Sequence, residues 1–182
     1  MIKKIKKSIG ERRLQNALKT YVRKKEFFNI EDINSVGIVF DATNAEDFEK
    51  VKNYANQLKQ MRKRVRCIGF YNARVTPRNI HYSKSDFDLF NVKELHLFGE
   101  PNNPYIQTFI SEIRDVLIDV NLSNKFPLRY ITALSHAKCK VGVNITENRN
   151  IHDVLISVNP TEGIDNYLKQ VDFYLQMINK KQ

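Results

Sequence analysis

The sequence has little of several residue types that mark special classes of protein. Its 182 residues include two cysteines, six glycines and no tryptophan. Two cysteines do not form a disulfide framework, and six glycines leave little room for a glycine-rich phosphate-binding loop. No apolar run approaches the roughly 20 residues that a membrane-spanning helix needs. We therefore expect neither a disulfide-stapled secreted domain nor an integral membrane protein.

The two cysteines and the N-terminus favour a cytoplasmic protein. Cys67 lies inside a predicted strand and Cys139 directly precedes one, and a small apolar thiol at such a position usually packs in the core. The basic N-terminus is not followed by the apolar segment of a secretory signal, and it is richer in lysine than a mitochondrial transit peptide. We expect a reducing compartment and no export.

Strong enzyme motifs are also missing from the sequence. It contains neither a P-loop nor a nucleophile elbow, and no Cys/His group has metal-ligand spacing. The four histidines (His81, His96, His136 and His152) are scattered, and a lone histidine is usually a surface or capping residue. We therefore predict no metal and no cofactor, and we regard an enzyme as less favoured than a binding protein.

What the sequence does have is positive charge, concentrated at one end. The formal net charge is +10 at pH 7, and residues 1–27 hold ten Lys or Arg against two Glu, which is +8. This excess exceeds what solubility requires. Apolar Ile2, Ile5 and Ile9 recur at helical spacing, and Leu14 and Leu18 do so again after Gly10. The pattern predicts a basic arm over residues 1–28, made of one or two amphipathic helices with a bend at Gly10.

The remainder, residues 29–182, predicts a single α/β domain that follows a polar linker at 29–35. Near-continuous apolar runs of strand length are typical of strands buried on both faces of a parallel sheet. Strands are expected at Val36–Phe40, Val65–Tyr71, Glu94–Phe98, Val116–Val120, Lys140–Val143 and Val154–Val158. Helices are expected from Asn44 to about Arg62, at Tyr105–Ile113, after Pro127 and from Ile164 to Ile178, while residues 72–91 are expected to be irregular, with a turn near 86–90. Because strands alternate with helices, the fold class is a three-layer α/β architecture with a mostly parallel sheet, Rossmann- or flavodoxin-like, with a basic helical N-terminal extension.

Two aspartates at predicted strand ends are the candidate catalytic or ligand-binding residues. Asp41 follows one buried strand, and Asp119 lies near the end of another. Ligands bind beyond the carboxyl ends of parallel strands, near the topological switch point. If these strands are neighbours, the two carboxylates with Asn44 and Asn121 could converge to hold Mg²⁺ or act as a base. The competing interpretation is that both aspartates close turns or accept bonds from nearby backbone N–H groups.

Clustered cations are the candidate nucleic-acid-binding residues, because they neutralise phosphates and release counterions. A solvated charged face is the competing interpretation, and it has more weight for the basic cluster at residues 59–66 than for the arm. The candidates are Lys3, Lys4, Lys6, Lys7, Arg12, Arg13, Lys19, Arg23, Lys24, Lys25, Arg62, Lys63 and Arg64.

Three stretches carry a resemblance to known proteins: Val36–Asn44, Asp115–Asn121 and Phe126–Gly142. With them, nearly the whole chain resembles a family of short, basic bacterial proteins described as a domain of unknown function. The resemblance implies a bacterial cytoplasmic protein and brings no activity with it. Asp119 to Gly142 is also similar to part of the N-terminal half of heptosyltransferase-type glycosyltransferases, a likeness that supports the fold more than the reaction.

The leading hypothesis is a non-enzymatic RNA- or ribosome-associated protein whose arm contacts the phosphate backbone. One alternative is a peripheral protein held on anionic membranes by the basic arm. Another is an enzyme or ligand-binding domain that uses Asp41 and Asp119 on a nucleotide or sugar phosphate. A third is an interaction module whose arm binds an acidic protein. The oligomeric state is left open.

Overall fold

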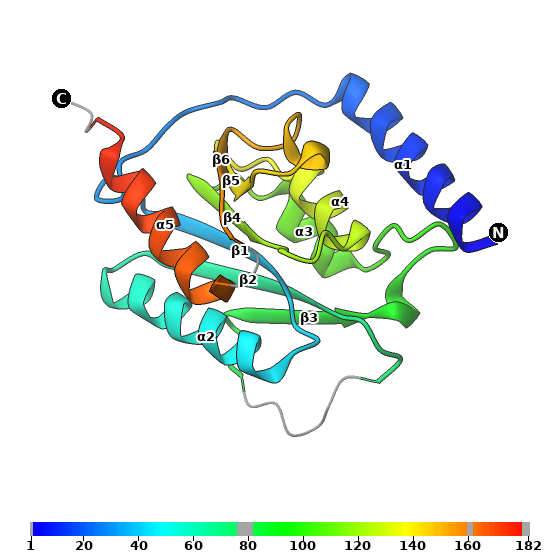
Figure 1. Cartoon of the computed structure of the whole chain (residues 1–182), viewed down its shortest axis with the longest axis horizontal. Helices are drawn as coiled ribbons and strands as arrows, with labels where there is room; N and C mark the ends of the chain where they lie inside the picture. Colours follow the sequence, from blue (N-terminus) through cyan, green and yellow to red (C-terminus); the bar gives the residue numbers. More distant parts are fainter. Residues whose placement is uncertain (1, 76–81, 160–161, 180–182) are drawn as a thin grey trace.

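Six parallel strands form the central sheet, in the order β3-β2-β1-β4-β5-β6 (Figure 1). The structure is a computed structural model that describes residues 2–75, 82–159 and 162–179, without the side chains of residues 2–4. The strands are β1 (Ser35–Asp41), β2 (Arg64–Tyr71), β3 (Phe87–Asn91), β4 (Val116–Val120), β5 (Cys139–Val143) and β6 (Val154–Ile156). The chain therefore leaves β1 in one direction along the sheet and returns to β4 on its other side, which makes the β1/β4 boundary the switch point.

Helices cover both faces of this sheet and give it three layers. The helices are α1 (Ile2–Thr20), α2 (Ala45–Gln60), α3 (Pro104–Ser111), α4 (Phe126–Leu134) and α5 (Gly163–Met177). Helices α2 and α5 pack on one face, where Phe48 and Tyr167 join Ile38 in a common core cluster. Helices α3 and α4 pack on the other face against Val39 and Leu117. The predicted α/β class is confirmed, with a Rossmann-like parallel sheet.

The first crossover shows how local sequence sets an element boundary. The Asn44 side chain accepts a hydrogen bond from the Asp47 backbone N–H at 3.1 Å, which caps α2 as its sequence predicts. At the other end, Arg62 adopts the left-handed region with φ 61°. That conformation reverses the chain directly into β2, and it is one that residues other than glycine adopt at a cost.

Two sequence predictions in the middle of the chain are wrong. Residues 87–91 form strand β3 instead of an irregular turn. Phe87 and Phe90 are buried on opposite faces of the sheet, while Asp88 is tolerated because β3 is an edge strand and Arg66 bonds its carboxylate at 2.6 Å. The strand expected at Glu94–Phe98 is absent from the described residues: Val92–Glu94 is a 3-10 turn, and Leu95 makes a single bridge to Pro101.

The basic arm begins with one helix that lies against the domain (Figure 1). Leu14 is 1% exposed and packs with Ala133 and Ile151. The bend expected at Gly10 does not occur, since α1 continues through it. A Cβ at Gly10 would lie 2.4 Å from the Phe98 carbonyl oxygen. Glycine at this position therefore permits close docking of the helix, and not a change of direction.

Candidate functional site

A crevice of about 300 Å³ lies at the carboxyl ends of β1 and β4. Asp41 lines it, but both carboxylate oxygens are already bonded. Oδ1 accepts the Thr43 backbone N–H at 3.0 Å, and Oδ2 accepts the Ser123 hydroxyl at 2.8 Å. Asp47 supplies a second carboxylate to the lining. Asp41 thus closes the turn that follows β1, as the structural interpretation of its sequence position predicts.

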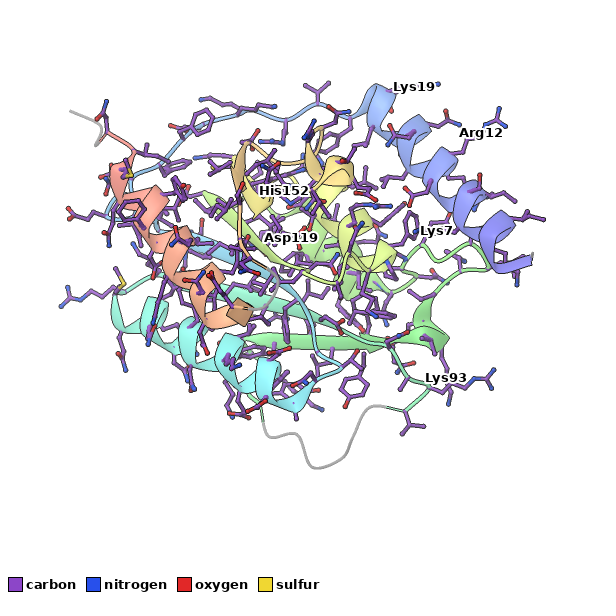
Figure 2. The ribbon with its side chains drawn as sticks, viewed as in Figure 1. Lys7, Arg12, Lys19, Lys93, Asp119 and His152 are labelled. Atoms are coloured by element: carbon purple, nitrogen blue, oxygen red, sulfur yellow. The ribbon has the colours of Figure 1, made fainter. Side chains whose placement is uncertain are left out.

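Asp119 does not share this crevice. Its side chain is 3% exposed, and Oδ2 lies 3.0 Å from Nε2 of His152, which is fully buried. Figure 2 shows both residues in the interior of the molecule. Oδ1 accepts the Asn121 backbone N–H at 3.0 Å, and the Tyr167 hydroxyl donates to the Asp119 carbonyl at 2.9 Å. Asp119 is therefore a buried structural acceptor, and its partner His152 could not be recognised from a scattered histidine in the sequence.

The two asparagines expected beside these aspartates also have structural roles. Asn44 caps α2, and the Asn121 side chain bonds the backbone N–H and carbonyl of Lys125 at 2.7 and 2.9 Å. Within the described ranges, no group of three or more His, Cys, Asp or Glu is arranged to hold a metal ion. The structure does not bring the four polar residues together as one catalytic site.

Ion pairs hold the inner side of α1 against the domain. Arg13 bonds Glu100 at 2.9 Å, and its guanidinium lies 5.0 Å from the centre of the Phe98 ring. Glu11 pairs with Arg129, whose side chain is 3% exposed. The acidic residue of α1 thus faces inward, where it neutralises a buried arginine of α4.

Two of the predicted nucleic-acid-binding cations are buried in the domain. The Arg23 side chain is 5% exposed, and its Nη2 makes a two-point contact with both carboxylate oxygens of Asp153, at 2.6 and 2.5 Å. Burial raises the pKa of Asp153, but hydrogen bonds from Arg23 and from the Lys140 backbone outweigh it and hold this pKa below its ordinary value. Lys63 is 6% exposed, and its ammonium donates to the carbonyls of Ile30 and Ile33. Both cations hold the segment that connects the arm to β1.

Other arm cations lie on the surface. Figure 2 shows Arg12 and Lys19 directed away from the body of the molecule. Four arm cations are exposed, and the structure shows no ion pair for any of them among the described residues: Lys7, Arg12, Lys19 and Lys24. Lys25 is exposed but contacts Asp153 at 3.2 Å, and Lys6 is half-buried. The side chains of Lys3 and Lys4 lie outside the described residues.

The second basic cluster does not extend the arm. Arg62 and Arg64 are exposed at the amino end of β2. Figure 1 places the end of α2, which precedes them, on the opposite side of the molecule from α1. The predicted cations therefore divide into a surface on the arm, a separate pair near β2 and two buried structural residues.

A buried lysine next to the arm was missed as a site by the sequence reasoning. Lys140 is 1% exposed, and its amine donates to the Ala133 carbonyl at 2.8 Å and to the Tyr21 hydroxyl at 3.2 Å. Burial, with the positive charge of Arg23, lowers the pKa of Lys140 to about 6. Its two neighbours in the sequence, Cys139 and Val141, are apolar, and both are buried in the core on the opposite face of the sheet. A lysine between two such residues is the sequence signal that could have identified it.

Comparison with known proteins adds a family to this description. The matching family model is described as a family of unknown function (DUF6913), and it covers residues 6–178. The chain belongs to this family. The DUF6913 match includes α1 from Lys6 onward, the buried Arg23 and Lys140, and both candidate aspartates. The resemblance to a family of unknown function is thereby confirmed.

No curated protein matches the chain. Among the helices that the structure describes, none is both long enough and apolar enough to cross a membrane. The function of this DUF6913 member has therefore to be argued from its own residues.

Proposed function

We propose that this protein is a non-enzymatic RNA-associated protein, with ribosomal RNA among its candidate targets, and that the outer face of its arm contacts the phosphate backbone. The observation that carries the proposal is the division of charge across α1. The inner side is docked through Leu14 and through the Glu11–Arg129 pair, while Arg12 and Lys19 on the opposite side, and Lys7 in the first turns of the helix, remain exposed without acidic partners in the described structure.

The chemistry of this face favours backbone contact over base recognition. Lysine and arginine neutralise phosphates and release counterions, which gives affinity that falls steeply with salt. Helix α1 contains no aromatic residue on which bases could stack. Positive charge on a rigid, docked helix keeps its spacing, so phosphates can be contacted without ordering a disordered tail at the same time.

The docking of the arm decides how the proposal is tested. Deleting residues 1–28 would expose the apolar partners of Leu14 and leave Asp153 buried without Arg23. A deletion would therefore mix loss of folding with loss of binding. Substitution of exposed cations by glutamine removes charge and leaves the docked side intact.

The experiment measures the affinity for single-stranded RNA by fluorescence anisotropy between about 50 and 200 mM salt. The test variant combines Lys7→Gln, Arg12→Gln and Lys19→Gln. The control combines Arg74→Gln, Lys84→Gln and Lys169→Gln, which removes the same three charges from exposed positions elsewhere. We expect the test variant to lose at least tenfold in affinity at low salt. The slope of log K against log salt concentration should become less steep by about 2 to 3, because each phosphate contact contributes about 0.7 to 0.9 to that slope.

The control should retain most of the wild-type affinity. Equal losses in the two triple variants would show a general effect of net charge and would refute a binding face on α1. Absence of RNA binding by the wild-type protein at low salt would refute the proposal altogether.

A second candidate function rests on two exposed isoleucines of the same helix. Ile5 is 53% exposed and Ile9 is 36% exposed, beside the cations of the arm. A basic helix with exposed apolar side chains can lie on an anionic membrane. Flotation with phosphatidylglycerol vesicles and with neutral vesicles tests this function. Binding that requires the anionic lipid, and that Ile5→Ser with Ile9→Ser abolishes, would support membrane association, and it would replace RNA association if the wild type does not bind RNA at low salt.

A further inference from the structure

A cavity of about 370 Å³ lies where the arm leaves α1 and crosses β5. This volume is within the range of about 300 to 1,000 Å³ that is common for small-molecule sites. Lys140 forms the interior wall, Tyr21 and Leu18 come from the arm, and Asn150 closes one side. The cavity is therefore built jointly by the arm and the domain.

The lining is basic. Arg23, Lys25 and Lys140 all contribute to it, and none of the described lining residues is acidic. Asp153 behind the wall neutralises Arg23 through its two-point contact. The Lys25 side chain is 66% exposed and contacts Asp153 at 3.2 Å. One carboxylate thus faces the guanidinium of Arg23 and the ammonium of Lys25, and the cavity holds an excess of positive charge even when the Lys140 amine is neutral.

The Lys140 amine has an unused donor when it is charged. An ammonium group has three N–H bonds, but the structure gives this one only two acceptors, the Ala133 carbonyl and the Tyr21 oxygen. The Tyr21 hydroxyl donates its own hydrogen bond to the Ser135 carbonyl. A third acceptor for Lys140 is lacking among the described residues, so a charged Lys140 would need one from a ligand.

The buried position of Lys140 and the charged groups around it explain why its pKa is low. Burial is the largest cause, and Arg23 and Lys25 also disfavour the charge, while Asp153 and Asp119 favour it. Together they lower the pKa of Lys140 to about 6. Tyr21, whose pKa burial raises to about 12, stays neutral and supplies no counter-charge. A bound anion would supply that charge, and the amine would take up a proton.

The geometry points to a binding site for a phosphate monoester in this cavity, with the phosphate dianion between Lys140 and Lys25 and its organic part against Leu18 and Tyr21. A phosphate dianion can neutralise the charges of both Lys25 and a protonated Lys140, whereas a carboxylate carries only one negative charge and can neutralise only one of them. The site uses different residues from the outer face of α1, so it does not depend on the RNA proposal. The phosphate could belong to a free small molecule or to the end of an RNA strand.

Isothermal titration calorimetry of the full chain tests the site, with adenosine 5′-monophosphate, inorganic phosphate and adenosine as probes. Titrations at pH 7.5 in two buffers of different ionisation enthalpy measure the protons taken up. We expect the monophosphate to bind saturably with uptake approaching one proton, inorganic phosphate to bind more weakly, and adenosine not to bind. Failure of both phosphates to bind at millimolar concentration, or equal binding of adenosine, overturns the proposal.

Two variants assign the binding to this cavity. Lys140→Met should abolish both the affinity and the proton uptake. Lys25→Gln changes an exposed side chain, so it keeps the fold even if Lys140→Met does not, and it should weaken binding at least fivefold. Lys19→Gln, on the outer face of α1, is the matched control and should bind as the wild type does. Unchanged affinity in Lys25→Gln and Lys140→Met would overturn the assignment.

The source of the phosphate is decided by two short RNA oligonucleotides that differ only in their 5′ end. Tighter binding of the 5′-phosphorylated strand, lost in Lys25→Gln, identifies a strand terminus as the ligand class. Binding of the monophosphate without any preference between the two strands identifies a small phosphorylated molecule. Each result supports the site, and they differ in the occupant.

Discussion

His152 joins Asp119 to the Asn148 carbonyl in the interior of the protein. Nε2 lies 3.0 Å from Asp119 Oδ2, and Nδ1 lies 3.2 Å from the Asn148 oxygen. A carbonyl oxygen only accepts hydrogen bonds, so Nδ1 is the donor to Asn148, and the ring bridges this carbonyl and the Asp119 carboxyl group. This relationship fixes the end of β4 to the segment before β6, and it makes Asp119 part of the scaffold.

The first prediction concerns the hydrogen bonds of Asp119. Asp119→Ala should lower the free energy of unfolding by about 3 kcal/mol or more, because it leaves a buried imidazole without its partner. Asp119→Asn keeps a group that can bond Nε2 of neutral His152, and it should cost about 1 kcal/mol. Urea unfolding measures both. A loss below about 1 kcal/mol in the alanine variant would contradict a structural role and return Asp119 to the candidate catalytic residues.

The second prediction uses the space beside the same ring. A Cβ at Gly142 would lie 2.3 Å from the His152 imidazole. Gly142→Ala should therefore destabilise the wild type by about 2 kcal/mol, because the closely packed ring must move. In a His152→Ala background the same change should cost much less. A double-mutant cycle measures this coupling, and additive losses would contradict the close approach.

The third prediction tests the docking of the arm. Helix propensity alone favours Gly10→Ala by about 1 kcal/mol, but the added Cβ would meet the Phe98 carbonyl oxygen at 2.4 Å. We expect the clash to prevail, so that the variant loses hydrogen-exchange protection in α1 while the sheet keeps its protection. Ser8→Ala, at an exposed position of the same helix, should leave protection unchanged. Increased protection of α1 in Gly10→Ala would show that the helix is not docked at this position.

The fourth prediction separates Arg23 from the surface cations by its pH dependence. Arg23→Gln leaves Asp153 buried without its principal counter-charge, and it should cost about 3 kcal/mol near pH 7. In the wild type, Asp153 has a folded pKa below its unfolded value, so its stabilising contribution is complete above the unfolded value of about 3.9 and is lost as the pH falls through the folded pKa.

The penalty of Arg23→Gln should therefore shrink as the pH falls below about 4 and through the lowered folded pKa of Asp153, because the carboxylate that Arg23 stabilises takes up a proton there. Urea unfolding between pH 3 and pH 7 measures this trend. Lys24→Gln is the control: Lys24 is exposed, and the loss there should stay within about 0.5 kcal/mol at every pH. A penalty that does not vary with pH would refute the Arg23–Asp153 pair as its cause.

The fifth prediction compares two neighbouring arginines that carry the same charge. Arg62 has φ 61°, so Arg62→Gly should stabilise the protein by about 0.5 to 1 kcal/mol, because glycine adopts this region without strain. Arg64 begins β2, and Arg64→Gly should destabilise by about the same amount, because glycine weakens a strand. Thermal unfolding distinguishes them, and destabilisation by both would contradict the left-handed backbone at Arg62.

The sequence by itself determined the class of fold and several boundaries. The run from Val36 to Phe40 is apolar throughout, and such a strand is stable only where both faces of a sheet are covered. Asn44 and Asp47 predicted the start of α2 because a helix cap is made within four residues of chain. The strand at 87–91 was not predictable in this way, because Asp88 is compatible with a strand only once Arg66 lies beside it at the sheet edge.

Only the tertiary structure decided what each cation does. In the sequence, Arg23 and Lys63 resemble the exposed Arg12 and Lys19, and only its apolar neighbours set Lys140 apart. Folding places Arg23, Lys63 and Lys140 against partners distant along the chain, which are Asp153, the Ile30 and Ile33 carbonyls, and the Tyr21 hydroxyl. A charged side chain leaves water only where such partners replace its hydration. Since those partners come together only in the folded protein, composition revealed the charge of the arm, and three-dimensional packing decided which charges face the solvent.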